Sequence, residues 1–174
     1  PTDSRNPFHS EHREKRDGSP MTSEELREEI AIELDNIEVV LRELSILHEE
    51  AKGREVSIRE KTAAAAFLAQ FYSGIENILK RISLFHSVPL PAGDNWHTDL
   101  FRRFCQSPYM TLPLLFDDQL ASDMAPFRKF RHVVYHGYGF ELDWDRMKEG
   151  LARTDDVFNR FKQKLNEYLN GLEK

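Results

Sequence analysis

The chain has 174 residues, of which 40% are hydrophobic and 31% charged, and its formal net charge is −6. This length fits one domain with its own core, and no apolar run approaches the roughly 20 residues that span a bilayer. The acidic balance argues against nucleic-acid binding through bulk charge. The single cysteine, Cys105, excludes an internal disulfide and favours a reducing, cytoplasmic compartment.

Residues 1–20 carry almost no aliphatic side chains and balance four Lys and Arg against four Asp and Glu. Such a segment cannot bury a core. We interpret it as an added leader or a disordered tail, with a functional arm as the alternative, and assign the domain to residues 21–174. The N-terminus is polar, so we expect no secretory signal.

From Thr22 onward the pattern is helical. Thr22 or Ser23 is a suitable N-cap, with glutamates in the first turns, and we expect the first helix to end near Lys52, with Gly53 beyond it. Apolar residues then recur at spacings of three and four, which predicts one buried stripe. The stripe consists of Ile30, Leu34, Ile37, Leu41, Leu44 and Leu47.

A second helix is predicted to begin after Ser57, because Glu60 three residues later completes a capping box. Its middle, "TAAAAFLAQFYSGIENILKRI", holds four successive alanines and Gly74, which permit close approach of another helix. The stretch "SVPLPAGDNW" then breaks the pattern. A short helix follows in "NWHTDLFRRFC", with Asn95 as its predicted cap.

The fourth predicted helix starts at Asp117 or Asp118 and ends near His136, because Gly137 and Gly139 terminate helices. A last amphipathic helix runs from about residue 143 to 172. No strand alternation is present in the sequence. We therefore predict an all-α fold, an antiparallel four-helix bundle with an additional short helix.

The stretch "RHVVYHGYG", residues 131–139, gathers the residues best suited to chemistry. Arginine matches phosphate oxygens, and histidine exchanges protons near neutral pH, so together they suit metal-free RNA cleavage. The sequence lacks HExxH, paired cysteines and an EF-hand loop. The alternative is a solvated helix face whose last histidine complements the helix dipole. The basic residues are Arg128, Lys129, Arg131, His132 and His136.

Helical geometry limits how Arg131 and His136 can cooperate. Residues five apart on a regular helix point about 140° apart. The helix must therefore end or unwind near His136 if both side chains are to reach one cleft, and Gly137 and Gly139 permit this change of direction. One histidine does not easily act as both base and acid, whereas a symmetric dimer supplies two copies.

The spacing of Arg131, His136 and Tyr138 resembles the Arg-x4-His-x-Tyr motif of HepT-like toxins, which belong to the HEPN superfamily of all-helical ribonucleases. The strings "FRHVVYHGYGFELDW", "FYSGIENILKRI" and "NWH" are similar to the same family, and the resemblance covers about residue 22 to the C-terminus. It implies a metal-independent endoribonuclease of a HepT/MntA toxin–antitoxin system that cleaves tRNA or mRNA.

The resemblance also implies roles for particular residues. Arg131 and His136 would be catalytic, in a homodimer whose two pairs face a shared cleft. An MntA-type nucleotidyltransferase antitoxin would transfer AMP from ATP to Tyr138, which would block the cleft with an anionic group. Catalysis would need no cofactor, and AMP would be a covalent modification. The alternative function is a non-catalytic helical adaptor, a partner subunit of a nucleotidyltransferase.

Further polar residues are candidates for supporting roles. Glu76 and Asn77 either reach the site and orient Arg131 or His136, or are satisfied polar residues at the edge of the core. We interpret His97 as an ordinary surface residue, with a wider basic cleft as the alternative. Candidate RNA-binding residues are His132, Arg128 and Lys129.

Overall fold

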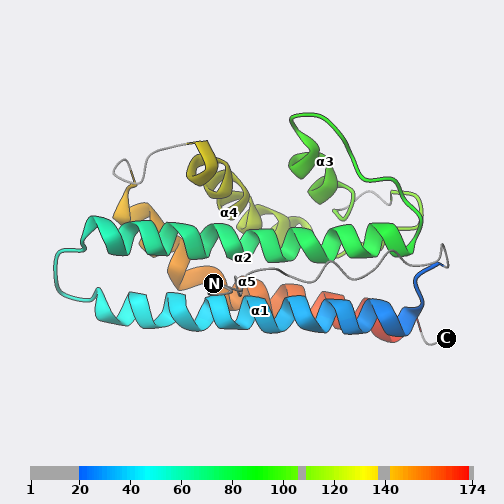
Figure 1. The fold of residues 1–174 in the computed structure, drawn as a ribbon, viewed down its shortest axis with the longest axis horizontal. Coiled ribbons are helices and arrows are strands. Elements are labelled where there is room, and N and C mark those ends of the chain that lie inside the picture. Colours follow the sequence, from blue (N-terminus) through cyan, green and yellow to red (C-terminus); the bar gives the residue numbers. More distant parts are fainter. Residues whose placement is uncertain (1–19, 106–108, 137–141, 173–174) are drawn as a thin grey trace, which may run out of the picture.

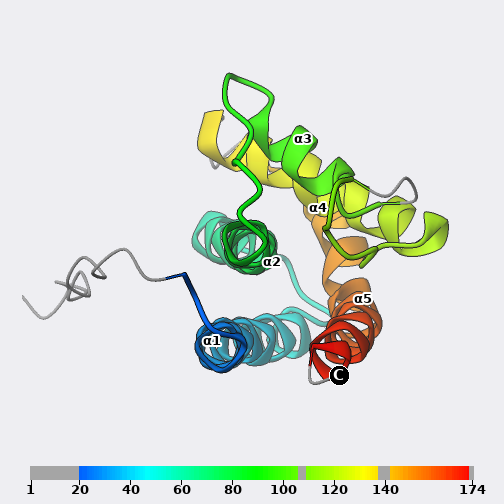
Figure 2. The same cartoon turned by 90° about the vertical axis from the view of Figure 1, so that its right-hand side faces the viewer.

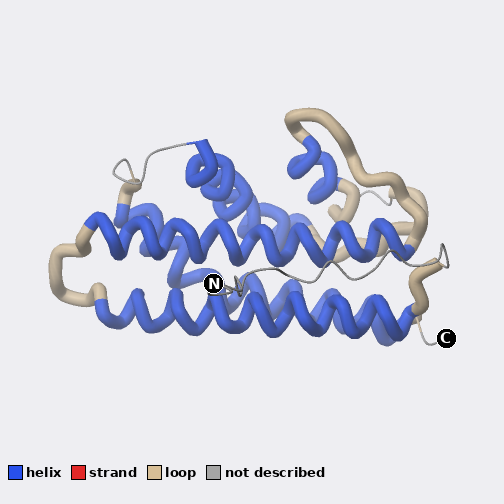
Figure 3. The backbone as a smooth tube through the Cα atoms, in the orientation of Figure 1, coloured by secondary structure: helices blue, strands red, loops and turns tan. Residues whose placement is uncertain are grey.

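The computed structural model describes residues 20–105, 109–136 and 142–172, which form five helices and no strand (Figure 3). This confirms the predicted all-α class. No helix in these ranges is long and apolar enough to cross a membrane. The helices are α1 (Ser23–Glu50), α2 (Ile58–Phe85), α3 (Trp96–Arg102), α4 (Asp118–His136) and α5 (Trp144–Gly171).

The two long helices α1 and α2 lie side by side and antiparallel, and a short loop joins them (Figure 1). Helix α5 packs beside α1, and α4 crosses α2 on the side facing away from α1 (Figure 2). The short α3 lies on the same side of α2 as α4. Helix α2 is therefore central, with one face toward α1 and another toward α3 and α4.

Local hydrogen bonds explain where the helices begin. The Thr22 hydroxyl accepts from the Glu25 amide at 3.2 Å, and the Glu25 carboxylate accepts from the Thr22 amide at 2.8 Å. Ser57 and Glu60 form the same reciprocal pair at the start of α2, as predicted. At α4, the carboxylate of Asp117 accepts from the Leu120 amide at 2.8 Å.

Two predicted helix ends differ in detail. Helix α1 ends at Glu50, two residues before the expected Lys52, and Gly53 adopts a positive φ of 73° in the loop. Asn95 stands at the N-cap of α3, but its side chain makes no capping hydrogen bond. The conformation of Asn95, with ψ near 11°, lies outside the extended region in which such caps accept.

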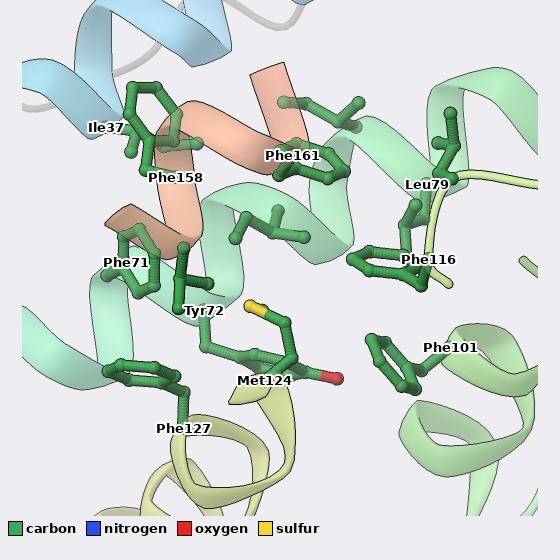
Figure 4. Packing of buried hydrophobic residues seen from close by; sticks show 14 of the residues in the cluster. Ile37, Phe71, Tyr72, Leu79, Phe101, Phe116, Met124, Phe127, Phe158 and Phe161 are labelled. Atoms are coloured by element: carbon green, nitrogen blue, oxygen red, sulfur yellow. The ribbon is translucent and has the colours of Figure 1, made fainter. Parts of the chain in front are cut away.

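Aromatic side chains from four helices and the loop before α4 fill the core (Figure 4). The rings of Phe71 on α2 and Phe127 on α4 meet edge to face at 5.2 Å between centroids. Phe116 and Phe161 stack at 5.4 Å. These contacts fix α4 and the segment before it against α2 and α5.

The contact between α1 and α2 is close because Gly74 has no side chain. A Cβ atom at this position would lie 2.6 Å from Cγ1 of Ile37 on α1. Beside this contact, Arg81 of α2 forms ion pairs with Glu29 at 2.8 Å and Glu33 at 2.6 Å, both on α1. The face of α2 toward α1 thus combines a close backbone contact at Gly74 with ion pairs from Arg81 to carboxylates of α1.

Candidate active site

A cleft of about 410 Å³ opens where α2, α3 and α4 meet. Three cationic side chains of α4 line it opposite the loop and helix at residues 94–98. A hollow of about 460 Å³ at residues 48–55 and 144–148 is lined by surface groups of mixed charge. The residues around the first cleft are Tyr72, Asp94, Asn95, His97, Thr98, Ala125, Arg128, Lys129 and Arg131.

Arg131 is held in the wall of this cleft by groups from two other helices. Its Nε donates to the Ser73 hydroxyl at 3.1 Å and lies 3.3 Å from Oε2 of Glu76, both on α2. Its Nη1 lies 3.1 Å from Nε2 of His97 on α3. The guanidinium, with 19% of its side chain exposed, is thus fixed in direction and remains at the surface of the cleft.

The ring of His97 bridges Arg131 and Glu76. Its Nδ1 lies 2.7 Å from Oε1 of Glu76 and its Nε2 faces the guanidinium. Because a guanidinium only donates, Nε2 must accept, and the imidazole proton is then on Nδ1, where it is donated to the carboxylate. This arrangement defines one tautomer of a neutral imidazole.

Glu76 is the buried member of this cluster. The residue is 1% exposed, and burial raises the pKa of its carboxyl to about 7, against the lowering effect of Arg131 and Lys80. A carboxylate in such a place is retained only when it has partners, and here these are Arg131 and His97.

The position of the cluster follows from the periodicity of α2. Tyr72, Ser73, Glu76 and Lys80 fall on one side of the helix, since residues four apart share a face. Helix α3 is fixed beside them by its buried Leu100 and Phe101, and by Lys80, which lies 4.6 Å from the Trp96 ring centroid. The cluster therefore joins residues distant in sequence through packing of the core.

The hydroxyl of Tyr72 is buried beside the cleft and has no hydrogen-bond partner among the described residues. Burial and the charge of Glu76 raise the pKa of this phenol, so it remains a neutral donor. A buried hydroxyl without a partner costs free energy.

The structure brings together four of the residues singled out in the sequence, Arg128, Lys129, Arg131 and Glu76. Arg128 and Lys129 line the cleft, and the guanidinium carbon of Arg128 lies 5.2 Å from the centroid of the Phe101 ring. His132 and His136 belong to α4, but the structure describes only the backbone of these two residues. Tyr138 also lies outside them.

The structure decides between the two interpretations of Asn77 and differs from the interpretation of His97. Asn77 does not reach the cluster, because it follows Glu76 by about 100° around the helix and faces α1, where its amide lies 3.5 Å from Glu33. His97 belongs to the cluster although its pattern suggested a surface residue. Helix α3 has only seven residues, too few for a periodic signal that would show which way His97 faces. The string "NWH", similar to the HepT-like family, was the one indication in the sequence that His97 belongs to a site.

Burial raises the pKa of the Cys105 thiol, which suits a packing residue. Within the described ranges, no group of three His, Cys, Asp or Glu side chains is placed to hold a metal ion.

Comparison with known proteins gives one match. A family model described as HepT-like protein matches residues 63–172, which include α3, α4, α5 and most of α2. No curated protein and no solved structure matches the chain. The matched region is well over half of the chain and contains the whole Ser73, Glu76, His97 and Arg131 cluster. The chain belongs to the HepT-like protein family.

Proposed function

We propose that this protein is a metal-independent endoribonuclease of a toxin–antitoxin system. Arg131 binds the scissile phosphate and His136 transfers a proton during cleavage of tRNA or mRNA. The observation that carries the proposal is the guanidinium of Arg131, fixed by Glu76 and His97 in the wall of a cleft that two further cations line. Membership of the HepT-like family supports the same reaction class.

The charges of the cleft suit a polyanion. Arg128, Lys129 and Arg131 face it, and Asp94 is the one carboxylate among the lining residues that the structure describes. A net-acidic protein can therefore bind RNA locally, in a site whose cations are directed at phosphate oxygens. A guanidinium oriented in advance loses little freedom when it binds a phosphate.

The position of His136 in the chain supports a role beside Arg131. Helix α4 runs to His136, and Gly137 follows directly. Because residues five apart on a regular helix point about 140° apart, His136 would reach the cleft through a departure from regular geometry in the last turn of α4, which a following glycine permits.

The short distance along the chain between His136 and Tyr138 supports the proposed antitoxin mechanism. Two residues span at most about 7 Å, so an AMP group on Tyr138 adds negative charge close to the end of α4. An MntA-type nucleotidyltransferase partner would transfer it from ATP. We further propose that the toxin is a homodimer with the two Arg131 and His136 pairs facing one cleft.

The test is cleavage of cellular RNA by the purified, unmodified protein. We expect products with 2′,3′-cyclic phosphate and 5′-hydroxyl ends, and a loss of at least about 100-fold for His136→Ala or Arg131→Ala. Arg42→Ala is the matched control, because Arg42 is exposed on α1. Undiminished cutting by His136→Ala would refute its catalytic role. No cleavage, combined with tight binding to the nucleotidyltransferase, would favour the adaptor.

Modification is tested by intact mass after co-expression with the nucleotidyltransferase. We expect additions of about 329 Da for each AMP group, localised to Tyr138 and absent from Tyr138→Phe. Reproducible absence of the added mass from active antitoxin preparations would contradict this mechanism.

A further inference from the structure

Cleavage by attack of the 2′-hydroxyl needs one group that removes a proton and another that delivers one. One imidazole does not easily perform both steps in one turnover, and the motif of α4 supplies one proposed catalytic histidine per protomer. The described cleft contains the imidazole of His97, which lies 3.1 Å from the guanidinium of Arg131 and is outside that motif. About a quarter of its side chain is exposed, so it can be reached from the cleft.

We infer that His97 is the general base of the proposed ribonuclease reaction, with Glu76 as its positioning residue. This inference rests on the proposed function. It assigns to His97, which lies outside the Arg-x4-His-x-Tyr motif, a role that the dimer would otherwise have to supply across its two-fold axis.

The tautomer of His97 is the first support. Its Nδ1 proton is donated to the Glu76 carboxylate at 2.7 Å, so the lone pair of Nε2 accepts from Nη1 of Arg131 at 3.1 Å in the wall of the cleft. A base must present a lone pair toward the substrate and must be stabilised once it has accepted a proton. Glu76 satisfies the second need, because a buried carboxylate beside Nδ1 stabilises the imidazolium.

The contact with Arg131 places that lone pair beside the reacting phosphate. A phosphate oxygen is an anionic acceptor and binds a guanidinium more strongly than a neutral imidazole does. An arriving phosphate would therefore take the Nη1 donor, and the Nε2 lone pair would face the nucleotide bound at Arg131. In the absence of substrate, the same hydrogen bond keeps both side chains in position.

The reaction balances without a further reactant. Nε2 of His97 takes the 2′-hydroxyl proton while the 2′-oxygen forms a bond to phosphorus. The bond between phosphorus and the 5′-oxygen breaks, and His136, initially protonated, gives its proton to that oxygen. The products are a 2′,3′-cyclic phosphate and a 5′-hydroxyl, and solvent returns the two histidines to their starting states.

The charged groups around His97 come from all of the elements packed against it. Glu76 and Lys80 lie on α2, Arg131 and the cleft cations Arg128 and Lys129 on α4, and Asp94 on the loop before α3. Because burial raises the pKa of Glu76 to about 7, the carboxylate that supports the base forms near neutral pH. We expect an acidic limb in the pH profile, along which the rate rises with pH, and this limb belongs to the Glu76 and His97 pair jointly.

Two substitutions separate proton transfer from positioning. His97→Gln places an amide oxygen near the position of Nε2 and keeps an acceptor for Arg131, whereas His97→Asn keeps a donor for Glu76. If His97 is the base, both variants lose at least about 100-fold in kcat. If it only positions Arg131, His97→Gln retains most of the activity, and the inference is wrong.

An RNA with sulfur in place of the 5′-oxygen at the cleavage site distinguishes base from acid. Sulfur leaves without a proton, so this substrate should restore cleavage to His136→Ala. It should leave His97→Gln as impaired as on the normal substrate, because deprotonation of the 2′-hydroxyl is still required. Restoration of His97→Gln instead would show that His97 is the acid and would overturn the inference.

Two further outcomes keep this inference separate from the proposed function. If the wild-type protein cuts RNA and both His97 variants cut at the wild-type rate, the function stands and the role of His97 falls. If the wild type does not cut RNA, both fall. Nitrogen NMR of the labelled wild-type protein requires no variant, and an Nε2–H tautomer of His97 at pH 8 would also overturn the assignment.

Discussion

Glutamine in place of Glu76 should remove a large pH dependence from the folding stability. The residue is 1% exposed, and burial raises the pKa of its carboxyl from 4.5 to about 7. Glutamine has nearly the same shape and carries no titratable proton. The two proteins should therefore differ most where the Glu76 carboxyl is ionised.

The sign and size follow from proton binding. Because the folded state holds this proton more tightly than the unfolded state, the contribution to stability is full below pH 4.5. It declines as the pH rises from 4.5 toward 7, where the unfolded chain releases the proton first, and it is lost above about 7. At about 1.4 kcal/mol per pKa unit, the loss is about 3 kcal/mol.

Urea unfolding at intervals between pH 4.5 and 8 measures this difference. We expect the wild type to lose about 3 kcal/mol relative to Glu76→Gln across the interval. Glu43→Gln, which removes an exposed carboxylate of α1, serves as the control for loss of a negative charge. A constant difference between wild type and Glu76→Gln at all pH values would refute the reasoning, since it would mean that burial does not control this carboxyl.

Three smaller predictions concern other contacts. Tyr72→Phe removes the hydroxyl without a described partner and should raise the free energy of unfolding by about 1 kcal/mol in urea titrations, whereas a decrease would indicate an undescribed partner. Gly74→Ala should lower it by about 1 to 2 kcal/mol, because the new Cβ would lie 2.6 Å from Ile37, and an unchanged midpoint would contradict the packing. Ser57→Ala should cost about 1 kcal/mol by loss of the Glu60 cap, measured by thermal unfolding, and retention of stability would show that water replaces the cap.

The helices could be predicted from the sequence because their signals are local. Thr22 with Glu25 and Ser57 with Glu60 stand three residues apart, and the structure shows both pairs hydrogen bonded as expected. Gly74 marked a close helix contact for a similar reason, since the absence of a side chain is visible in the sequence itself. In each case the residues that decide the structure are near one another in the chain.

The cluster around Arg131 could be predicted only in part. Glu76 and Asn77 are adjacent, and both faces of α2 are covered, so the sequence does not show which of the two faces α4. The placement of His97 depends on how α3 docks, which core residues such as Leu100 and Phe101 decide. That docking brings His97 to Glu76, 21 positions away in the chain, and to Arg131, 34 positions away. Contacts over such separations produce no periodic pattern in the sequence.

The buried carboxylate of Glu76 holds the groups of a small cleft in place, and its burial lowers the folding stability. In the proposed ribonuclease the net charge of the chain cannot attract RNA, so RNA binding in the cleft would depend on a few cations held in fixed directions. Glu76 fixes two of the groups in that cleft, the guanidinium of Arg131 and the ring of His97. Its burial destabilises the fold at neutral pH by about 3 kcal/mol, the amount that Glu76→Gln should recover. A substitution that raises stability while it lowers RNA cleavage is the result expected of a residue retained for its position in the site rather than for folding.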